Sequence, residues 1–219
     1  MKITQRLRTQ AQPVWSSIME LPFVVELYNG SLPMDKFKAY ILQDYTYLTD
    51  AIRNFSLIAS RVDSVVVMKE IVEIAHLEAT GEFKGYEEYL GRLGYDLQDA
   101  AATEPLPVNV SYRSFLLAIS ATRTTAEALT AVLPCFWSYH EIALFHRDAL
   151  SRNENLTYRD WASVYVSDDY VKLLNKLKDL VDNLAGQVPY ERLKDVFLTA
   201  SRYEYLYWDS VYTSASWPV

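Results

Sequence analysis

Hydrophobic side chains recur every three to four residues along almost the whole chain, and no stretch shows the sustained alternation of a β-strand. This spacing places the apolar residues on one face of a helix. Gly and Pro, the main turn formers, number only 6 and 8 in 219 residues. The pattern therefore predicts an all-α fold. Because no linker, repeat or low-complexity segment interrupts it, a single helical domain is expected over residues 1–219.

Prolines, glycines and asparagines divide this pattern into expected helices. The first runs from about Thr4 toward Tyr28, with an interruption at Pro13 or Pro22 and an end at Asn29-Gly30. Residues 100–109, which contain Pro105 and Pro107, are expected to form a loop. A second helix is expected from about residue 34 to beyond 55, and a third over 63–94 with Gly81 or Gly85 as a candidate break. A helix over 124–151 is expected to kink at Pro134. The remaining helices are expected over 111–121, 155–165, 168–184 and 189–212.

Charge and composition narrow the classes of function. Lys and Arg total 21 against 28 Asp and Glu, a net charge of −7, and no basic face is visible, so neither nucleic acid nor membrane is expected as a partner. The charged, amphipathic opening lacks the apolar core of a signal peptide, and no stretch approaches the roughly 18 apolar residues of a membrane span. A cytoplasmic location is expected. Glycine-rich phosphate-binding motifs are absent, which argues against nucleotide chemistry.

Metal ligands are scarce. The single cysteine, Cys135, excludes an intrachain disulfide and a cysteine-rich metal site. Glu73-Ile-Ala-His76 is one Glu-x-x-His motif, whereas a ferritin-like di-iron site needs two. His140 and His146 do not have the spacing of His-Glu-x-x-His. We therefore expect no metal and no cofactor, and interpret the three histidines as structural or surface residues.

Tyrosine is the compositional anomaly, with 17 residues beside 5 Trp and 8 Phe. A tyrosine offers a flat ring and a hydroxyl, which suits a pocket for a polar aromatic ligand. For most of the 17 tyrosines, an aromatic core or subunit interface is the better explanation. The question is which polar groups lie among the rings.

Cys135 follows Pro134 directly and precedes Tyr139 by four residues, so the thiol and the phenol share one helix face. A cysteine in an apolar helix is usually an inert small hydrophobe. The adjacent proline and the neighbouring phenol favour a functional role, and both interpretations stay open.

Two carboxylates lie on aromatic faces. Asp44 has Tyr40 four residues before it and Tyr47 three after it, which indicates either an ion pair with an arginine or a group reserved for a ligand. Glu204 precedes Tyr207 by three residues. Burial among rings would raise its pKa and suit it to general acid and base catalysis, and a solvated glutamate is the alternative.

Four segments in order resemble the TenA family, thiaminase II, over about residues 5–212. The specific part is the Pro-Cys segment together with the late Tyr-Glu and Tyr-Trp-Asp segment. The four are Gln43–Leu48, Pro134–Tyr139 with Glu141, Tyr158-x-x-Trp161-x-x-x-Tyr165, and Tyr203-Glu204-x-x-Tyr207-Trp208-Asp209.

The resemblance implies a haem-oxygenase-like helical bundle and aminopyrimidine aminohydrolase activity in thiamine salvage. The product would be 4-amino-5-hydroxymethyl-2-methylpyrimidine, released from the aminomethyl pyrimidine and more weakly from thiamine. By the same resemblance Cys135 would be the nucleophile, Glu204 the acid and base, and Asp44 the anchor for the pyrimidine. The aromatic lining would be Tyr47, Tyr112, Tyr139 and Tyr165.

The resemblance also implies a homotetramer. We expect its contacts at the first helix, with Trp15 and Ile18, and at the tail, with Tyr212 and Trp217.

Three positions depart from the family pattern and bear on substrate preference more than on reaction type. Tyr207 stands where the family often has Phe, Tyr170 follows an acidic pair where Phe is usual, and Tyr86 lies in a tract where His is common. Two alternative functions stay open: a pyrimidine-binding or regulatory protein without turnover, and a metal-dependent oxidase that uses Glu73 and His76.

Overall fold

The computed structural model describes residues 1–218, apart from the side chain of Glu82, and within this range all regular structure is helical. The expected all-α class is confirmed. The α-helices are α1 (Ile3–Gln10), α2 (Gln12–Met19), α3 (Pro22–Asn29), α4 (Met34–Ser60), α5 (Val65–Leu77), α6 (Phe83–Leu93), α7 (Leu97–Ala102), α8 (Pro107–Thr122), α9 (Thr125–Phe145), α10 (Arg147–Arg152), α11 (Leu156–Ser163), α12 (Asp168–Leu184) and α13 (Tyr190–Thr213). Three short elements join them: the π-helical turn η1 (Glu78–Glu82) and the 3₁₀ turns η2 (Val164–Val166) and η3 (Ala185–Gln187).

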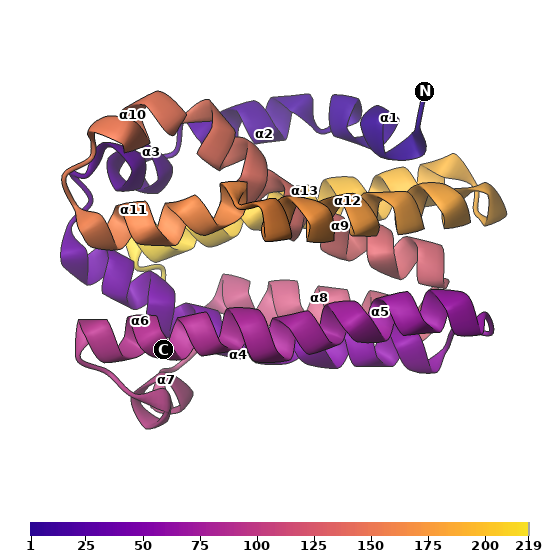
Figure 1. The fold of residues 1–219 in the computed structure, drawn as a ribbon, viewed down its shortest axis with the longest axis horizontal. Coiled ribbons are helices and arrows are strands. Elements are labelled where there is room, and N and C mark those ends of the chain that lie inside the picture. Colours follow the sequence, from indigo (N-terminus) through magenta and orange to yellow (C-terminus); the bar gives the residue numbers. More distant parts are fainter. Residues whose placement is uncertain (219) are drawn as a thin grey trace.

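The helices form a bundle in which α9 and α13 run through the middle (Figure 1). One side of the bundle is made by α4, α5, α6 and α8, and the opposite side by α11 and α12 together with α1 and α2. Helix α9 packs against α13, α12 and α8, so it links the two sides. Side chains on α4, α9 and α13 can therefore meet near the centre.

The first expected helix is divided into three because of its two prolines. Pro13 and Pro22 lie in the first turn of α2 and α3, where the missing N–H is not needed and the fixed φ suits a helix start. Gly30 then ends α3 with φ of 89°, in the left-handed region that glycine adopts without strain. The sequence predicted an interruption at one of these two prolines, and the structure has one at each; the end at Asn29-Gly30 is as predicted.

Two sequence-based boundaries were wrong. The expected loop at 100–109 is partly helical: α7 begins with a capping box between Asp96 and Asp99, and α8 begins at Pro107. The helix expected over 124–151 ends at Phe145, where His146 separates it from α10. Pro134 lies inside α9, and the bend at this proline stays a prediction.

The helix expected from residue 63 is interrupted at η1, which contains Gly81, one of the two glycines named as a candidate break. A π-helical turn inserts an extra residue into a helix and often marks a functional site. Here it carries Glu78, whose side chain is 4% exposed. The interruption turns this carboxylate inward, where a pocket lies.

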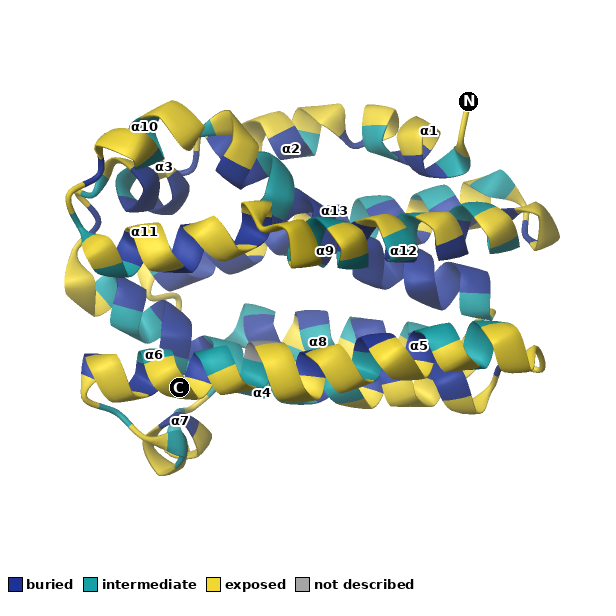
Figure 2. Cartoon of the chain, in the orientation of Figure 1, coloured by how far each residue is buried: buried dark blue, intermediate teal, exposed yellow. Residues whose placement is uncertain are grey.

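Helix α9 is buried over most of its length, whereas its neighbours show alternating buried and exposed bands (Figure 2). Among the described helices, α9 is the one long and apolar enough to cross a membrane, and 72% of its apolar window is buried inside the bundle. This differs from the expectation from the sequence that no stretch approaches the apolar length of a membrane span. Burial of this extent is typical of the central helix of a packed core.

Two hydrophobic clusters make up the core. One gathers around Trp15 and Phe55, and the other around Phe23 and Trp208. Cys135 packs against both clusters, so the thiol lies where they meet.

Two of the aromatic and apolar residues expected at a subunit contact belong to this core instead. Trp15 and Ile18 are 0% exposed within the single chain, and Trp15 Nε1 donates to Ser201 Oγ at 2.9 Å. Their assignment to a subunit contact was wrong, because α2 turns this face toward α13.

Substitution of Gly30 tests the end of α3. An added Cβ would meet Asn153 Oδ1 at 2.5 Å in a backbone conformation that alanine disfavours, so Gly30→Ala is expected to lower the free energy of unfolding by about 1–3 kcal/mol. Gly91→Ala in α6 is the control, since nothing lies within 4 Å of its added Cβ, and a gain of about 0.5–1 kcal/mol is expected. Urea unfolding measures both, and equal effects would contradict the account of Gly30.

Candidate active site

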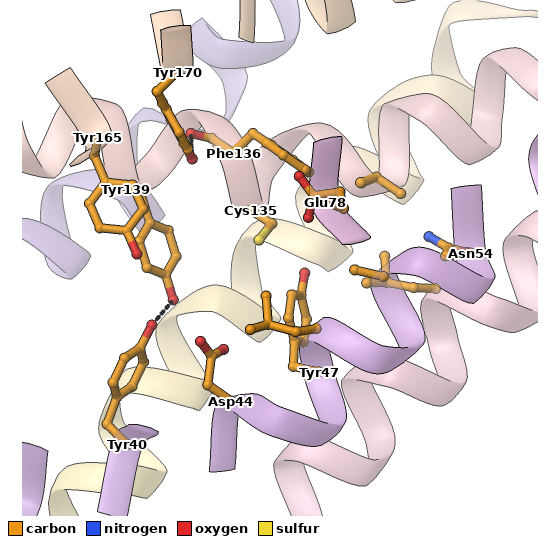
Figure 3. Close-up of a pocket in the computed structure, with 14 residues that line it drawn as sticks. Tyr40, Asp44, Tyr47, Asn54, Glu78, Cys135, Phe136, Tyr139, Tyr165 and Tyr170 are labelled. Atoms are coloured by element: carbon orange, nitrogen blue, oxygen red, sulfur yellow. Dashed lines mark hydrogen bonds between the residues drawn. The ribbon is translucent and has the colours of Figure 1, made fainter. Parts of the chain in front are cut away.

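A narrow pocket with a cavity volume of about 30 Å³ lies at the junction of the two core clusters (Figure 3). Its walls come from α4, from the middle of α9, from η1, from η2 and the start of α12, and from Leu116 of α8. The lining residues are Tyr40, Asp44, Tyr47, Leu48, Ala51, Asn54, Glu78, Leu116, Val132, Cys135, Phe136, Tyr139, Tyr165 and Tyr170. Five of the seven residues named in the sequence analysis are among them.

Helix α4 supplies one polar wall. Tyr40, Asp44 and Tyr47 follow at intervals of four and three residues, so helical geometry puts all three on the face turned toward the pocket. The Asp44 side chain also borders a second, outer cavity. Asp44 therefore stands where a ligand entering from outside would meet the inner pocket.

Helix α9 supplies the thiol. Cys135 is partly exposed and lines the pocket, and Tyr139 lies one turn further along the same face. The hydroxyls of Tyr139 and Tyr40 are 3.2 Å apart, a hydrogen bond across the pocket between α9 and α4. The ring of Tyr139 packs against that of Tyr165 with centroids 4.9 Å apart. The aromatic lining thus extends onto η2.

Tyr112 and Glu204, the other two predicted residues, lie behind this wall. The ring of Tyr47 packs on that of Tyr112, with centroids 5.5 Å apart, and Tyr112 Oη donates to Glu204 Oε1 at 2.6 Å. Glu204 is 2% exposed, and burial raises the pKa of its carboxyl to about 7, although the hydrogen bond from Tyr112 partly opposes the rise. A carboxyl with this pKa can give and take a proton at neutral pH.

The wider outer cavity continues from the inner pocket, with a volume of about 650 Å³ between α5, η1 and α6 on one side and η2 and α12 on the other. Asp44, Glu78 and Tyr165 border both spaces. An ion pair between Lys176 of α12 and Glu73 of α5, 2.6 Å long, joins the two sides of this cavity. The outer cavity provides a route to the thiol.

Nine of the fourteen lining residues were not among the predicted site residues, and Glu78, Tyr170 and Tyr40 are three of them. Glu78 was missed because a π-helical turn breaks the periodicity that would have placed it on an inner face. Tyr170 donates from Oη to the carbonyl of Phe136 at 2.9 Å and so ties α12 to α9, a contact between distant segments. Tyr40 was placed on the correct face of α4 without being assigned a role. Its position one turn before Asp44 was the signal available.

The histidines occupy structural or surface positions, as expected. His140 Nδ1 lies 2.8 Å from the carbonyl of Tyr165, His146 Nε2 lies 2.9 Å from that of Met19, and His76 is exposed on α5. Glu73, the partner of His76 in the motif, pairs with Lys176. Among the side chains that the structure describes, which leave out Glu82, no three His, Cys, Asp or Glu gather in an arrangement that could hold a metal ion.

The helical bundle has the haem-oxygenase-like fold: a domain from Shewanella denitrificans described with that fold superimposes with a TM-score of 0.77 at 18% identity, covering 96% of this chain and 92% of that one. The model of the TENA/THI-4/PQQC family matches residues 8–214. The chain belongs to this family.

Relatives and solved structures agree with this assignment. The chain is 31% identical to the aminopyrimidine aminohydrolase of Helicobacter pylori, over 98% of this chain and 100% of that protein, and 30% identical to that of Halalkalibacterium halodurans, over 99% and 98%. The TenA homologue of P. horikoshii superimposes with a TM-score of 0.94 at 41% identity, covering 97% of this chain and 99% of that one. The predicted fold and the prediction of a hydrolase of the TenA family are confirmed.

The raised pKa of Glu204 predicts a pH-dependent difference between wild type and Glu204→Gln. A carboxyl group with a pKa of about 7 in the fold and 4.5 when unfolded stabilises the fold fully below pH 4.5 and loses this contribution as the pH rises to 7. The loss is about 3 kcal/mol. Glutamine carries no titrating group, so the variant should gain stability relative to wild type across this interval. Denaturant unfolding at several pH values measures the difference, and a constant difference from pH 4.5 to 7 would contradict the raised pKa.

Proposed function

We propose that this protein is an aminopyrimidine aminohydrolase that acts in thiamine salvage. It hydrolyses the aminomethyl pyrimidine to the hydroxymethyl pyrimidine, and thiamine more slowly. The observation that carries the proposal is the convergence of Cys135 and Asp44 on one aromatic pocket, with Glu204 behind its wall. The family membership and the full-length relatives named for this activity support it.

Asp44 binds the polar edge of the pyrimidine in this proposal. Its two carboxylate oxygens accept hydrogen bonds from the exocyclic amino group and from a protonated ring nitrogen, a charge-assisted pairing. The rings of Tyr47, Tyr139 and Tyr165 hold the flat faces of the substrate. The substrate is then oriented by its edge and by its faces together.

Cys135 carries out the covalent step. Its thiolate adds to the ring carbon next to the substituted one, which breaks the aromaticity and sends electrons into the bond to the exocyclic methylene. The amine leaves with a proton supplied by Glu204. Water then adds to the methylene and gives a proton to the Glu204 carboxylate, and loss of the thiolate restores the ring. Sulfur suits both the first addition and the final elimination, because a thiolate is a strong nucleophile and a good leaving group.

Cys135→Ser tests the nucleophile. The hydroxyl is harder to ionise and harder to expel, so turnover should fall by roughly a thousandfold or more. Ammonia release from the aminomethyl pyrimidine and thiazole release from thiamine measure turnover. Calorimetry with the hydroxymethyl product is the matched control, because binding should persist if the pocket is intact.

The outcomes separate the competing functions. Near wild-type hydrolysis by the serine variant would remove Cys135 from the mechanism. A wild-type protein that binds the pyrimidine and releases nothing would favour the binding or regulatory alternative. A metal found by analysis of the purified protein, together with oxidase activity that depends on this metal, would favour the metal-dependent oxidase. The chemistry would then lie away from the Cys135 thiol.

We further propose a cytoplasmic homotetramer that has no nucleic-acid or membrane partner. Two separate apolar areas remain exposed on the chain: Val65 and Val66 at the start of α5, at 61% and 69% exposure, and Leu144 and Phe145 at the end of α9, at 45% and 67%. A tetramer with dihedral symmetry needs more than one kind of interface, and two such areas suit that requirement.

Light scattering tests the assembly. A mass near four times the 25.2 kDa of one chain is expected at micromolar concentration. Phe145→Ser should reduce this mass without loss of helical circular dichroism, and Leu156→Ser, which replaces an exposed apolar residue of α11, is the control. A wild-type mass near 25.2 kDa would refute the tetramer.

A further inference from the structure

Buried polar atoms that have no hydrogen-bond partner in the fold indicate where a ligand could supply one. Within residues 1–218 six side-chain atoms are of this kind: Asn54 Oδ1, Ser120 Oγ, Ser138 Oγ, Tyr190 Oη, Tyr207 Oη and Trp208 Nε1. A buried hydroxyl left without a partner costs about 1–3 kcal/mol of stability. Of the two tyrosine hydroxyls in this set, that of Tyr207 lies beside the candidate active site.

The ring of Tyr207 contacts the rings of the two tyrosines that flank Asp44, Tyr40 and Tyr47. Its ring centroid is 6.1 Å from that of Tyr40 and 6.3 Å from that of Tyr47. These two residues come one turn before and one turn after Asp44 on the same face of α4. A ring in contact with both therefore lies over the helix turn that carries Asp44.

The chemistry of the hydroxyl suits a binding role. Tyr207 is 3% exposed, and burial first and then the charge of Asp44 raise its pKa well above the usual value for a tyrosine, so it stays protonated at neutral pH. A neutral phenol oxygen still has lone pairs that accept from an N–H group. Nothing in the described fold donates to this oxygen and it is closed to water, so a ligand donor reaches it when binding moves the neighbouring rings of Tyr40 and Tyr47 aside.

We propose that the hydroxyl of Tyr207 is a ligand-recognition group that accepts a hydrogen bond from the exocyclic amino group of an aminopyrimidine bound to Asp44. An amino group on a heteroaromatic ring has two N–H donors. Asp44 accepts one of them, and Tyr207, which packs on both sides of the same helix turn, accepts the other. This inference rests on the proposed function, and it adds a residue that distinguishes rings with an amino group from rings without one.

Tyr207→Phe tests the proposal because it removes one oxygen and keeps the ring. Two ligands are compared by calorimetry: 4-amino-5-hydroxymethyl-2-methylpyrimidine and the analogue with hydrogen in place of the amino group. Affinity for the first should fall by about three- to tenfold, the loss of one neutral hydrogen bond, and affinity for the second by less than about twofold. The melting temperature should equal or exceed that of wild type, because an unsatisfied hydroxyl has been removed.

Tyr190→Phe is the matched control. Its hydroxyl is also buried without a partner, and it lies on α13 at the end far from the pocket. Affinity for both ligands should be unchanged in this variant. Stability should again equal or exceed that of wild type, so the two variants differ only in binding.

Each other result has a definite meaning. Equal losses of affinity for both ligands in Tyr207→Phe, unchanged affinity for the amino ligand, or a clear fall in melting temperature would overturn the inference and leave the proposed function standing. A wild-type protein that binds neither ligand would overturn the proposed function and this inference with it.

Discussion

A carboxyl group buried among tyrosine rings, as Glu204 is, must either keep its proton or find a cation. Tyr112 Oη donates to it at 2.6 Å, and burial holds its pKa near neutrality, so the group stays ready to exchange a proton. The same burial costs stability whenever the group ionises. The proposed chemistry depends on this compromise, because an exposed glutamate would be ionised at pH 7 and could not supply a proton.

The bundle places the Cys135 thiol and the Asp44 carboxylate on one pocket, with the Glu204 carboxyl behind its wall. Cys135 lies on α9, Asp44 on α4 and Glu204 on α13, and α9 packs against α13 and α12. Because the thiol packs against both hydrophobic clusters, the pocket lies where neither cluster fills the space. The outer cavity leads to this point from between α5–α6 and α12, past the inward-facing Glu78.

Local patterns predicted part of this arrangement correctly. The helix breaks at Pro13 and Pro22 and the end at Gly30 follow from backbone geometry that a single residue controls. The prediction of a loop at 100–109 was wrong because a capping box starts α7 and Pro107 starts α8. At a helix start, proline favours the helix and does not break it. The prediction that Trp15 lies at a subunit contact was wrong for another reason. An aromatic residue suits a core and an interface equally, and only the packing shows which of the two it occupies.

The sequence by itself determined the helical class, the shared face of Asp44 with its flanking tyrosines, and the shared face of Cys135 with Tyr139, because helical periodicity relates residues within one turn of each other. Only the tertiary structure decided that these two faces meet, that Glu78 turns inward at a π-helical turn, and that Glu204 lies behind Tyr47 and Tyr112. It also decided that the Tyr207 hydroxyl is left without a partner. These features depend on contacts between segments as much as 160 residues apart, such as the ring contact of Tyr47 and Tyr207, which no local periodicity encodes.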